Sequence, residues 1–196
     1  MSERSLVLVR HGATEWSKSG QHTGTTDLPL LPEGERQATE LAPVLASTQF
    51  AEVLCSPRLR ARATCVLAGL GDRMQIVDDL AEWDYGDYEG LTSAQIRERR
   101  PGWEIWRDGC PGGESPAQVA ERVDRVIDRA VSGGDPAEPV VLFAHGHILR
   151  VLAVRWLDVQ MSAVARLPLS PATVSVLGHE HGIRGLLAWN AGSVVI

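Results

Sequence analysis

The stretch Leu6-Val7-Leu8-Val9-Arg10-His11-Gly12 decides the fold that this sequence predicts. Its four consecutive apolar residues are typical of a strand that is buried on both faces of a parallel sheet. Arg10, His11 and Gly12 follow this run directly, and open α/β sheets bind their ligands at the carboxyl ends of the strands. The stretch therefore predicts a central strand that carries a ligand-binding histidine at its end.

A second histidine repeats this arrangement far along the chain. The apolar run Val140-Val141-Leu142-Phe143-Ala144 leads directly into His145 and Gly146. One histidine at a strand end is about as often a hydrogen-bonded structural residue as a ligand-binding one. Two of them, each followed by glycine, favour one shared site, because parallel strands end at the same edge of the sheet.

Strand-like and helix-like patterns alternate along the 196 residues, which favours an α/β sandwich in a single domain, residues 1–196. The last two strands form a hairpin around a segment that contains His179 and His181, so the sheet is mixed and these histidines are turn residues rather than metal ligands. Predicted strands span residues 5–10, 51–55, 75–77, 140–144, 173–177 and 183–188. Predicted helices span residues 33–46, 57–69, 92–99, 103–107, 115–130 and 147–157, and residues 12–32 form a loop.

Local signals mark the starts of two of these helices. Ser56 followed by Pro57 is typical of an N-cap and a first helical position. Ser115-Pro116-Ala117-Gln118 is a capping-box pattern. The apolar face of the helix that follows is formed by Val119, Val123, Val126, Ile127 and Ala130. Between these helices, residues 80–114 are rich in tryptophan and form an excursion of the kind that covers a site as a lid.

The composition restricts the partners and the location of the protein. The formal net charge is −6, so the overall charge attracts neither nucleic acid nor an anionic membrane. No apolar run approaches the ~20 residues of a membrane span. Cys55, Cys65 and Cys110 are an odd number without CxxC spacing, which favours a reducing compartment. We expect a soluble cytoplasmic protein, and a homo-oligomer is compatible with the sequence.

Positive groups gather where the two predicted strand ends meet. Arg60 lies in the first turns of the helix after Pro57, where its guanidinium and the free N–H groups of the helix both favour an anion. Arg10 adds a second guanidinium beside His11, and the planar guanidinium fork matches phosphate oxygens. Arg58 and Arg62 are better explained as a solvated helix face. The pattern predicts a site for a tetrahedral oxyanion.

Glu82 is the candidate proton donor for a phosphoryl site without a metal. It stands in Leu80-Ala81-Glu82-Trp83-Asp84-Tyr85, where aromatic neighbours predict a desolvated and partly protonated carboxyl group. The other acidic residues of this region are expected to be turn and surface residues: Asp79, Asp84, Asp87 and Glu89.

Five ordered segments resemble the histidine phosphatases, also called the phosphoglycerate mutase-like superfamily. They are RHGATEW from Arg10, LPEGERQA from Leu31, SPRLRARAT from Ser56, the segment from Glu82 to Gly90, and FAHGHILR from Phe143. The likeness is closest to sedoheptulose-1,7-bisphosphatase-type members and broad-specificity acid phosphatases. It implies a three-layer α/β/α sandwich around a mostly parallel six-stranded sheet with one antiparallel strand.

The resemblance also implies roles for the candidate residues. His11 would become a transient phosphohistidine, Arg10, Arg60 and His145 would hold the phosphoryl oxygens, and Glu82 would act as acid and then as base. No metal or other cofactor is implied. Implied substrate-binding residues are Ser17, His22, Thr23, Gly24, Tyr85, Gly146 and Arg150. The sequence departs from the family at His22, where sugar bisphosphatases tend to carry tyrosine, and at Ser17, where many members carry asparagine.

We therefore expect a metal-independent phosphatase of a small phosphorylated metabolite, most readily a sugar phosphate or bisphosphate. A phosphoglycerate mutase is a weaker alternative, because Trp83 follows Glu82 where mutases carry arginine, and because the chain ends at Ile196 without their longer tail. Two further alternatives are a metal-dependent hydrolase that uses His145 and His147, and a phospholigand-binding protein without catalysis. Trp83, Trp103 and Trp106 are candidates for the mouth of the pocket, with at least one of them in the core.

Overall fold

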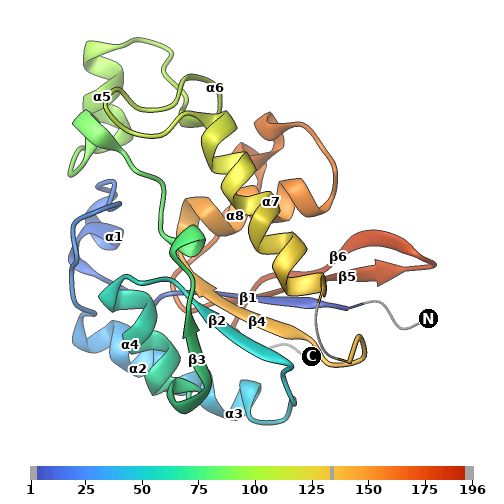
Figure 1. Ribbon diagram of the computed structural model, residues 1–196. Helices are drawn as coiled ribbons and strands as arrows, with labels where there is room; N and C mark the ends of the chain where they lie inside the picture. Colours follow the sequence, from blue (N-terminus) through green and yellow to red (C-terminus); the bar gives the residue numbers. More distant parts are fainter. Residues whose placement is uncertain (1–3, 133–134, 193–196) are drawn as a thin grey trace.

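A six-stranded sheet forms the centre of the molecule (Figure 1). The structure is a computed structural model that describes residues 4–132 and 135–192. Ile196, whose position at the chain end was an argument against a mutase, lies outside the described residues. The strands are β1 (Leu6–Arg10), β2 (Glu52–Cys55), β3 (Met74–Ile76), β4 (Val140–Ala144), β5 (Val174–Glu180) and β6 (Ile183–Ala191). Their order is β3-β2-β4-β1-β5-β6. Strands β1 to β4 are parallel and β5 is antiparallel to both of its neighbours, which confirms the predicted mixed sheet.

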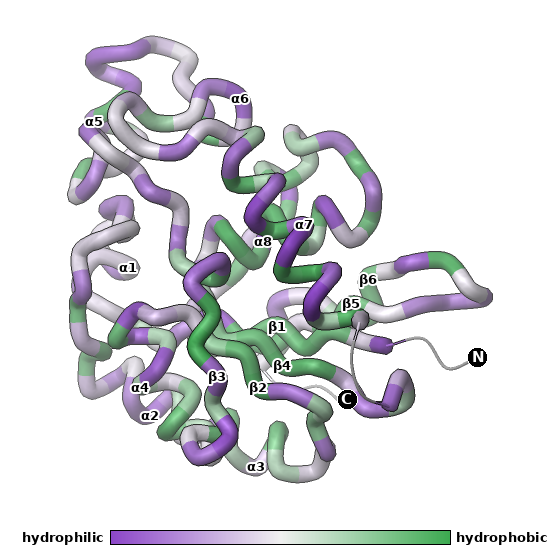
Figure 2. Tube along the Cα trace, viewed as in Figure 1, coloured by the Kyte–Doolittle hydropathy of each residue, from purple (hydrophilic) through white to green (hydrophobic). Residues whose placement is uncertain are grey.

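Helices cover both faces of the sheet, because successive side chains of a strand point to opposite faces. From β1, Leu6 and Leu8 pack in one core with α7 (Pro116–Ser132) and α8 (Gly146–Trp156). Val7 and Val9 pack in the other core, beneath α2 (Pro32–Glu40), α3 (Ala42–Leu45) and α4 (Leu59–Leu67). The α/β/α sandwich is confirmed, and Figure 2 shows apolar strands between helices with polar outer faces.

Helix α7 carries its apolar residues on one face, as predicted. Val119, Val123, Val126, Ile127 and Ala130 are all buried. Ser115 and Gln118 form the predicted capping box, in which the Gln118 backbone N–H donates to the Ser115 hydroxyl and the Ser115 N–H donates to the Gln118 side chain. The capping box therefore identifies the start of this helix, and the apolar pattern identifies its inner face.

The excursion that includes residues 80–114 lies beyond the carboxyl ends of β1 and β4 (Figure 1). It contains the short helices α5 (Ser93–Arg99) and α6 (Ile105–Asp108). Short 3₁₀ helices lie at Gly71–Arg73, Asp78–Leu80, Gly86–Tyr88 and Met161–Arg166. Within residues 4–132 and 135–192, no helix has the length and apolar character that crossing a membrane requires.

Several predicted boundaries were wrong. The helix predicted over residues 33–46 is divided at Leu41, because Pro43 in the first turn of α3 has no N–H to continue the α2 ladder. The loop predicted over residues 12–32 contains a further helix, α1 (Glu15–Ser19), with a capping box formed by Thr14 and Ser17. The hairpin turn is reduced to His181 and Gly182, both with positive φ, so His179 lies in β5 rather than in the turn.

Ser56 does not cap α4, because its hydroxyl lies 2.7 Å from Nε2 of His145. The helix begins at Leu59, after Arg58, and Pro57 precedes it. The backbone N–H of Leu59 donates instead to the carboxylate of Asp27, at 2.7 Å. A side chain from a distant loop therefore satisfies the first turn of this helix.

The loop after β1 is held against α2 by two glycines. A Cβ atom on Gly34 would lie 2.2 Å from the carbonyl oxygen of Ala13, and a Cβ on Gly12 would lie 2.4 Å from that of Gly34. Leu31 donates its N–H to Ala13, and the N–H of Ala13 donates to Gln37. Because only glycine permits this approach, these residues fix the position of the chain that carries His11.

Gly34→Ala is expected to lower the free energy of unfolding by about 1–3 kcal/mol through overpacking. Alanine ordinarily favours a helix over glycine by about 1 kcal/mol, so the expected sign is the reverse of helix propensity. Urea unfolding of Gly34→Ala and of a control, Gly185→Ala, measures this, since a Cβ at Gly185 meets its nearest atom at 3.9 Å. A Gly34→Ala protein at least as stable as the wild type would contradict the close approach.

Candidate active site

A cavity of about 240 Å³ opens at the carboxyl ends of β1 and β4. The first turn of α8, the loop around α1 and the segment after Leu80 complete its walls. The structure brings most of the predicted site residues together on these walls, namely Arg10, His11, Ser17, His22, Thr23, Glu82, Tyr85, Gly146 and Arg150. Arg60, His145 and Gly24 are not among the lining residues.

His11 is buried, and a single hydrogen bond sets its tautomer. Its Nδ1 lies 2.8 Å from the carbonyl oxygen of Gly12. A carbonyl oxygen only accepts, so Nδ1 carries the proton and Nε2 keeps a free lone pair. Burial lowers the pKa of His11 well below its ordinary value, and the positive charges of Arg10 and Arg60 lower it further. The geometry therefore presents a neutral imidazole with an available nucleophilic nitrogen.

Behind His11, Arg60 and His145 form a fully buried polar layer. Nε of Arg60 donates to Nδ1 of His145 at 3.1 Å, so the other ring nitrogen carries the proton and donates to the hydroxyl of Ser56. Arg60 also donates to the carbonyl oxygens of Thr23 and Thr26, at 2.7 and 3.1 Å. The His145 ring centroid lies 5.2 Å from that of His11. These bonds fix the position of the positive charge of Arg60 relative to His11. Direct contact of Arg60 and His145 with phosphoryl oxygens stays a prediction.

Arg10 brings an incompletely paired guanidinium to the cavity. One terminal nitrogen donates to the carbonyl oxygen of Leu169, but the buried Nε has no hydrogen-bond partner within the described residues. A Cβ on Gly146 would lie 3.3 Å from Cζ of Arg10, so glycine allows the guanidinium to lie against the start of α8. Burial lowers the pKa of Arg10, although Glu82 opposes this effect. A guanidinium with an unpaired buried N–H beside a helix N-terminus attracts an anion.

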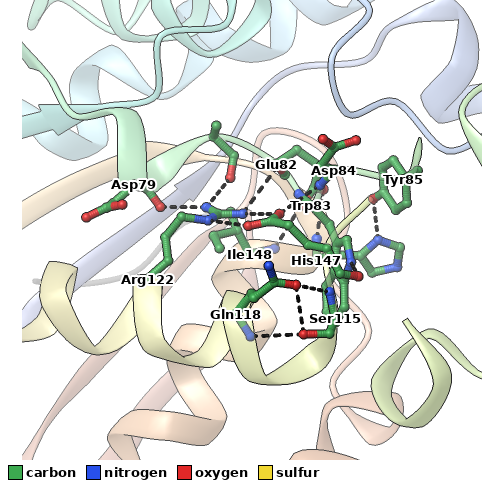
Figure 3. A network of polar contacts seen from close by, with 12 residues as sticks. Asp79, Glu82, Trp83, Asp84, Tyr85, Ser115, Gln118, Arg122, His147 and Ile148 are labelled. Atoms are coloured by element: carbon green, nitrogen blue, oxygen red, sulfur yellow. Dashed lines mark hydrogen bonds and ion pairs between the residues drawn. The ribbon is translucent and has the colours of Figure 1, made fainter. Parts of the chain in front are cut away.

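Glu82 lies on the same N-terminus. Its carboxylate accepts the backbone N–H groups of His147 and Ile148, each at 2.9 Å, and that of Trp83, also at 2.9 Å (Figure 3). Glu82 is buried, as predicted. The three N–H donors fix the orientation of the carboxylate at the start of α8, and the partial protonation of Glu82 stays a prediction.

Tyr85, His22 and His147 form the outer wall of the cavity. Burial raises the pKa of Tyr85 well above its ordinary value, so the phenol keeps its proton and donates to Nδ1 of His147 (Figure 3). His22 stacks on Tyr85 with ring centroids 4.6 Å apart. Burial, His22, Arg150 and Arg10 hold the pKa of His147 well below its ordinary value. His147 was not predicted to face the substrate, although its position two residues after His145 on a helix start was a usable signal.

A second cavity of about 240 Å³ adjoins the first and shares His22, Ser93, His147 and Arg150 with it. Arg97, Glu104 and Trp106 are among its other lining residues. The guanidinium of Arg150 lies 4.6 Å from the Trp106 ring centroid. The two cavities together can hold a ligand longer than a phosphate group.

The three candidate tryptophans have different roles. Trp83 and Trp103 are buried, and their indole N–H groups donate to the carbonyl oxygens of Glu114 and Gly109, at 3.0 and 2.9 Å. Both therefore belong to the core. Trp106 is half-buried, lines the second cavity and meets His147 edge-on at 4.8 Å.

The predicted contacts Ser17, Thr23 and Gly24 lie on the loop around α1. Ser17 lines the cavity, and its hydroxyl donates to the carbonyl oxygen of Thr14. The N–H of Gly24 donates to the carboxylate of Glu89 at 3.0 Å, which removes it from the cavity wall. Glu89 also accepts the N–H of Thr26 at 2.9 Å. Glu89 lies in a turn, as predicted, and is half-buried, and it joins this loop to the excursion.

The contacts of His145 and His147 do not favour metal binding. Both ring nitrogens of His145 bond to Arg60 and Ser56, and Nδ1 of His147 bonds to Tyr85. In the part of the chain that the structure describes, no group of three or more His, Cys, Asp or Glu residues is arranged to hold a metal ion. These bonds give each imidazole a role inside the cavity wall instead.

The buried histidines predict a loss of stability in acid. Burial lowers the pKa of His22 to about 4 from the ordinary value of 6.5. Between these values the unfolded chain binds a proton that the folded chain does not, so stability falls as the pH falls. His22→Gln should reduce the dependence of the unfolding free energy on pH between pH 6 and pH 5 by up to about 1.4 kcal/mol per pH unit. Urea unfolding measures this, with exposed His181→Gln as the control. Equal pH dependence in wild type and His22→Gln would refute it.

Known proteins resemble this chain over nearly its whole length. Residues 6–192 match the histidine phosphatase superfamily (branch 1). An acid phosphatase of Mycobacterium tuberculosis is 41% identical over 183 residues, covering 92% of this chain and 89% of the relative. Sedoheptulose 1,7-bisphosphatase of Saccharomyces cerevisiae is 43% identical over 179 residues, covering 76% of this chain and 66% of the relative.

The fold has a solved counterpart as well. A mycobacterial glucosyl-3-phosphoglycerate phosphatase in complex with VO3 has a TM-score of 0.84 at 32% identity, covering 96% of this chain and 99% of that chain. The matched segment, the relatives and the solved structure all lead to the same assignment. This chain belongs to branch 1 of the histidine phosphatase superfamily.

Proposed function

We propose that this protein is a metal-independent phosphomonoester hydrolase that forms a phosphohistidine on Nε2 of His11. The single observation that carries the proposal is the hydrogen bond between Nδ1 of His11 and the Gly12 carbonyl oxygen, because it leaves a neutral nucleophile in a cation-lined cavity. The family and its phosphatase members support the reaction class.

In the first step, the lone pair of Nε2 attacks phosphorus while the bond to the leaving oxygen breaks. The phosphoryl oxygens lie against the free donors of Arg10 and the N-terminus of α8. Arg60 adds positive charge from behind His11. Because these groups are fixed before the substrate arrives, they stabilise the transition-state charge without reorganisation.

Glu82 transfers the proton in both steps. In the complex with substrate, Glu82 carries the proton that the leaving group needs. That proton passes to the departing alkoxide. The carboxylate then accepts a proton from a water molecule that attacks the phosphohistidine, which releases phosphate and restores neutral His11.

The adjoining cavity supports a hydroxylated substrate such as a sugar phosphate or sugar bisphosphate. Arg97 and Arg150 supply cations for a second acidic group, and Trp106 supplies an aromatic face. The names of the yeast relative and of the mycobacterial structure both describe phosphorylated sugar derivatives as substrates. These features support a sugar phosphate or sugar bisphosphate as the substrate.

A cytoplasmic location belongs to the same proposal. Cys55, Cys65 and Cys110 are buried free thiols. Free thiols fit a compartment that keeps cysteine reduced.

Phosphate release in excess chelator tests the reaction. The substrates are sedoheptulose bisphosphate, fructose bisphosphate, 3-phosphoglycerate, nucleotides and an aryl phosphate. His11→Ala should lower turnover at least about a thousandfold, because it removes the nucleophile. His181→Gln, with the exposed histidine of the hairpin turn, should retain wild-type turnover.

Each contrary result points to one alternative. Loss of wild-type turnover in chelator would favour a metal-dependent hydrolase. Rapid conversion of 3-phosphoglycerate to 2-phosphoglycerate with a bisphosphorylated primer would favour a mutase. Binding of phosphosugars without turnover or phosphohistidine would favour a phospholigand-binding protein.

Trp106→Ala should change the ranking of sugar phosphates while turnover of a small aryl phosphate stays within about threefold, since Trp106 lines only the second cavity. Its free energy of unfolding should fall much less than that of Trp103→Ala, for which about 3–5 kcal/mol is expected from full burial. Steady-state kinetics and urea unfolding measure the two effects. An unchanged ranking would exclude the second cavity from substrate binding.

A further inference from the structure

A half-buried ion pair outside the cavity holds the segment that carries Glu82. Arg122 on α7 binds Glu114 through two parallel hydrogen bonds, from Nε at 2.9 Å and from a terminal nitrogen at 2.7 Å. The two side chains are only 11% and 21% exposed. Neither residue lines the cavity. A two-point pair of this kind has a fixed direction as well as a fixed distance.

The same guanidinium binds the backbone immediately before Glu82. The second terminal nitrogen of Arg122 donates to the carbonyl oxygens of Asp79 and Ala81, each at 2.7 Å. The nitrogen that binds Glu114 also lies 3.5 Å from the carbonyl oxygen of Glu82 itself. One side chain therefore holds the carbonyl groups of three residues at and before Glu82.

Glu114 holds the backbone immediately after Glu82. Its carboxylate accepts the N–H of Asp84 at 2.8 Å, and its backbone N–H donates to the carbonyl oxygen of Asp84 at 2.9 Å. Its own carbonyl oxygen accepts the indole N–H of Trp83 at 3.0 Å. The two residues of this ion pair therefore fix the chain on both sides of Glu82, and Figure 3 shows the contact of Arg122 with Asp79.

We infer that Arg122 and Glu114 are positioning residues for proton transfer, since they set where the Glu82 carboxylate lies relative to His11. The inference rests on the proposed function. The carboxylate has its own bonds to α8, but these fix only the end of the side chain. If the backbone on either side of Glu82 is no longer held, the position of the Glu82 carboxylate relative to His11 can vary. Small displacements of a catalytic acid or base strongly reduce the rate of proton transfer.

Arginine is specific to this role. The contacts use Nε and both terminal nitrogens of the planar guanidinium at once. A lysine ammonium has three donors at one point, so it can retain the charge but not both the carboxylate fork and the carbonyl contacts. Arg122→Lys therefore keeps the positive charge but cannot make all of these hydrogen bonds at once.

Nearby Arg125 supplies a matched control. It lies on the same helix and forms a two-point pair with Asp79, but with the Asp79 side chain and not with the backbone. Its side chain is 54% exposed. Arg125→Lys therefore changes an arginine ion pair of the same helix without releasing the backbone at Glu82.

The experiment compares wild type, Arg122→Lys, Glu114→Gln, Glu82→Gln and Arg125→Lys by rapid-quench measurement of phosphohistidine formation. One substrate is a sugar phosphate, whose alkoxide leaving group needs a proton. The other is an aryl phosphate with a good leaving group, which needs none. Arg122→Lys and Glu114→Gln should slow phosphorylation by the sugar phosphate about 10- to 100-fold, as supporting residues of a catalytic group commonly do. Phosphorylation by the aryl phosphate should change by less than about threefold, as should the KM of the sugar phosphate.

The outcomes separate this inference from the proposed function. Equal slowing with both substrates would show general structural damage and would overturn the inference, as would rates equal to those of Arg125→Lys. Wild type without phosphohistidine, or Glu82→Gln with unchanged sugar phosphate kinetics, would overturn the proposed function and the inference with it. If Arg122→Lys does not fold, Glu114→Gln decides, because it preserves side-chain volume and the backbone contacts of residue 114.

Discussion

The site depends on the hydrogen bonds between the Glu82 carboxylate and the first turn of α8. The carboxylate satisfies the backbone N–H groups of His147 and Ile148, which a helix start leaves unpaired. The same bonds tie the excursion to the strand and helix that carry His145. A negative group thus occupies one side of an N-terminus whose other side faces Arg10. The helix start therefore holds the proposed proton-transfer group and leaves its remaining positive field for the proposed phosphate site.

The same arrangement keeps the buried histidines neutral. A cavity rich in arginine disfavours imidazolium, and the pKa values of His11, His145 and His147 are all lowered well below the ordinary value, with burial as the largest cause. Neutral imidazoles can act as nucleophile and as donors of a single N–H, which a protonated ring could not. We expect this arrangement to lose stability in acid, because the proposed nucleophile and its neighbouring histidines are kept neutral beside fixed cations.

Local patterns predicted most of the fold but only part of the site. The apolar runs before His11 and His145 and the apolar face of α7 identified the sheet centre, because burial imposes these periodicities directly. Ser56 was misread because its partner, His145, is 89 residues away. The donors to Glu82 on α8 are 65 and 66 residues away. Contacts of this range follow from the topology, and no local pattern contains them.

The position of phosphate on His11 tests the central claim most directly. We would mix Glu82→Gln with an aryl phosphate, quench it in alkali, and assign the phosphorylated nitrogen by ³¹P and ¹⁵N NMR. Because Nδ1 of His11 is held as N–H by the Gly12 carbonyl oxygen, the account predicts phosphate on Nε2 of His11 alone. Phosphate on Nδ1, on another residue, or on none would contradict it.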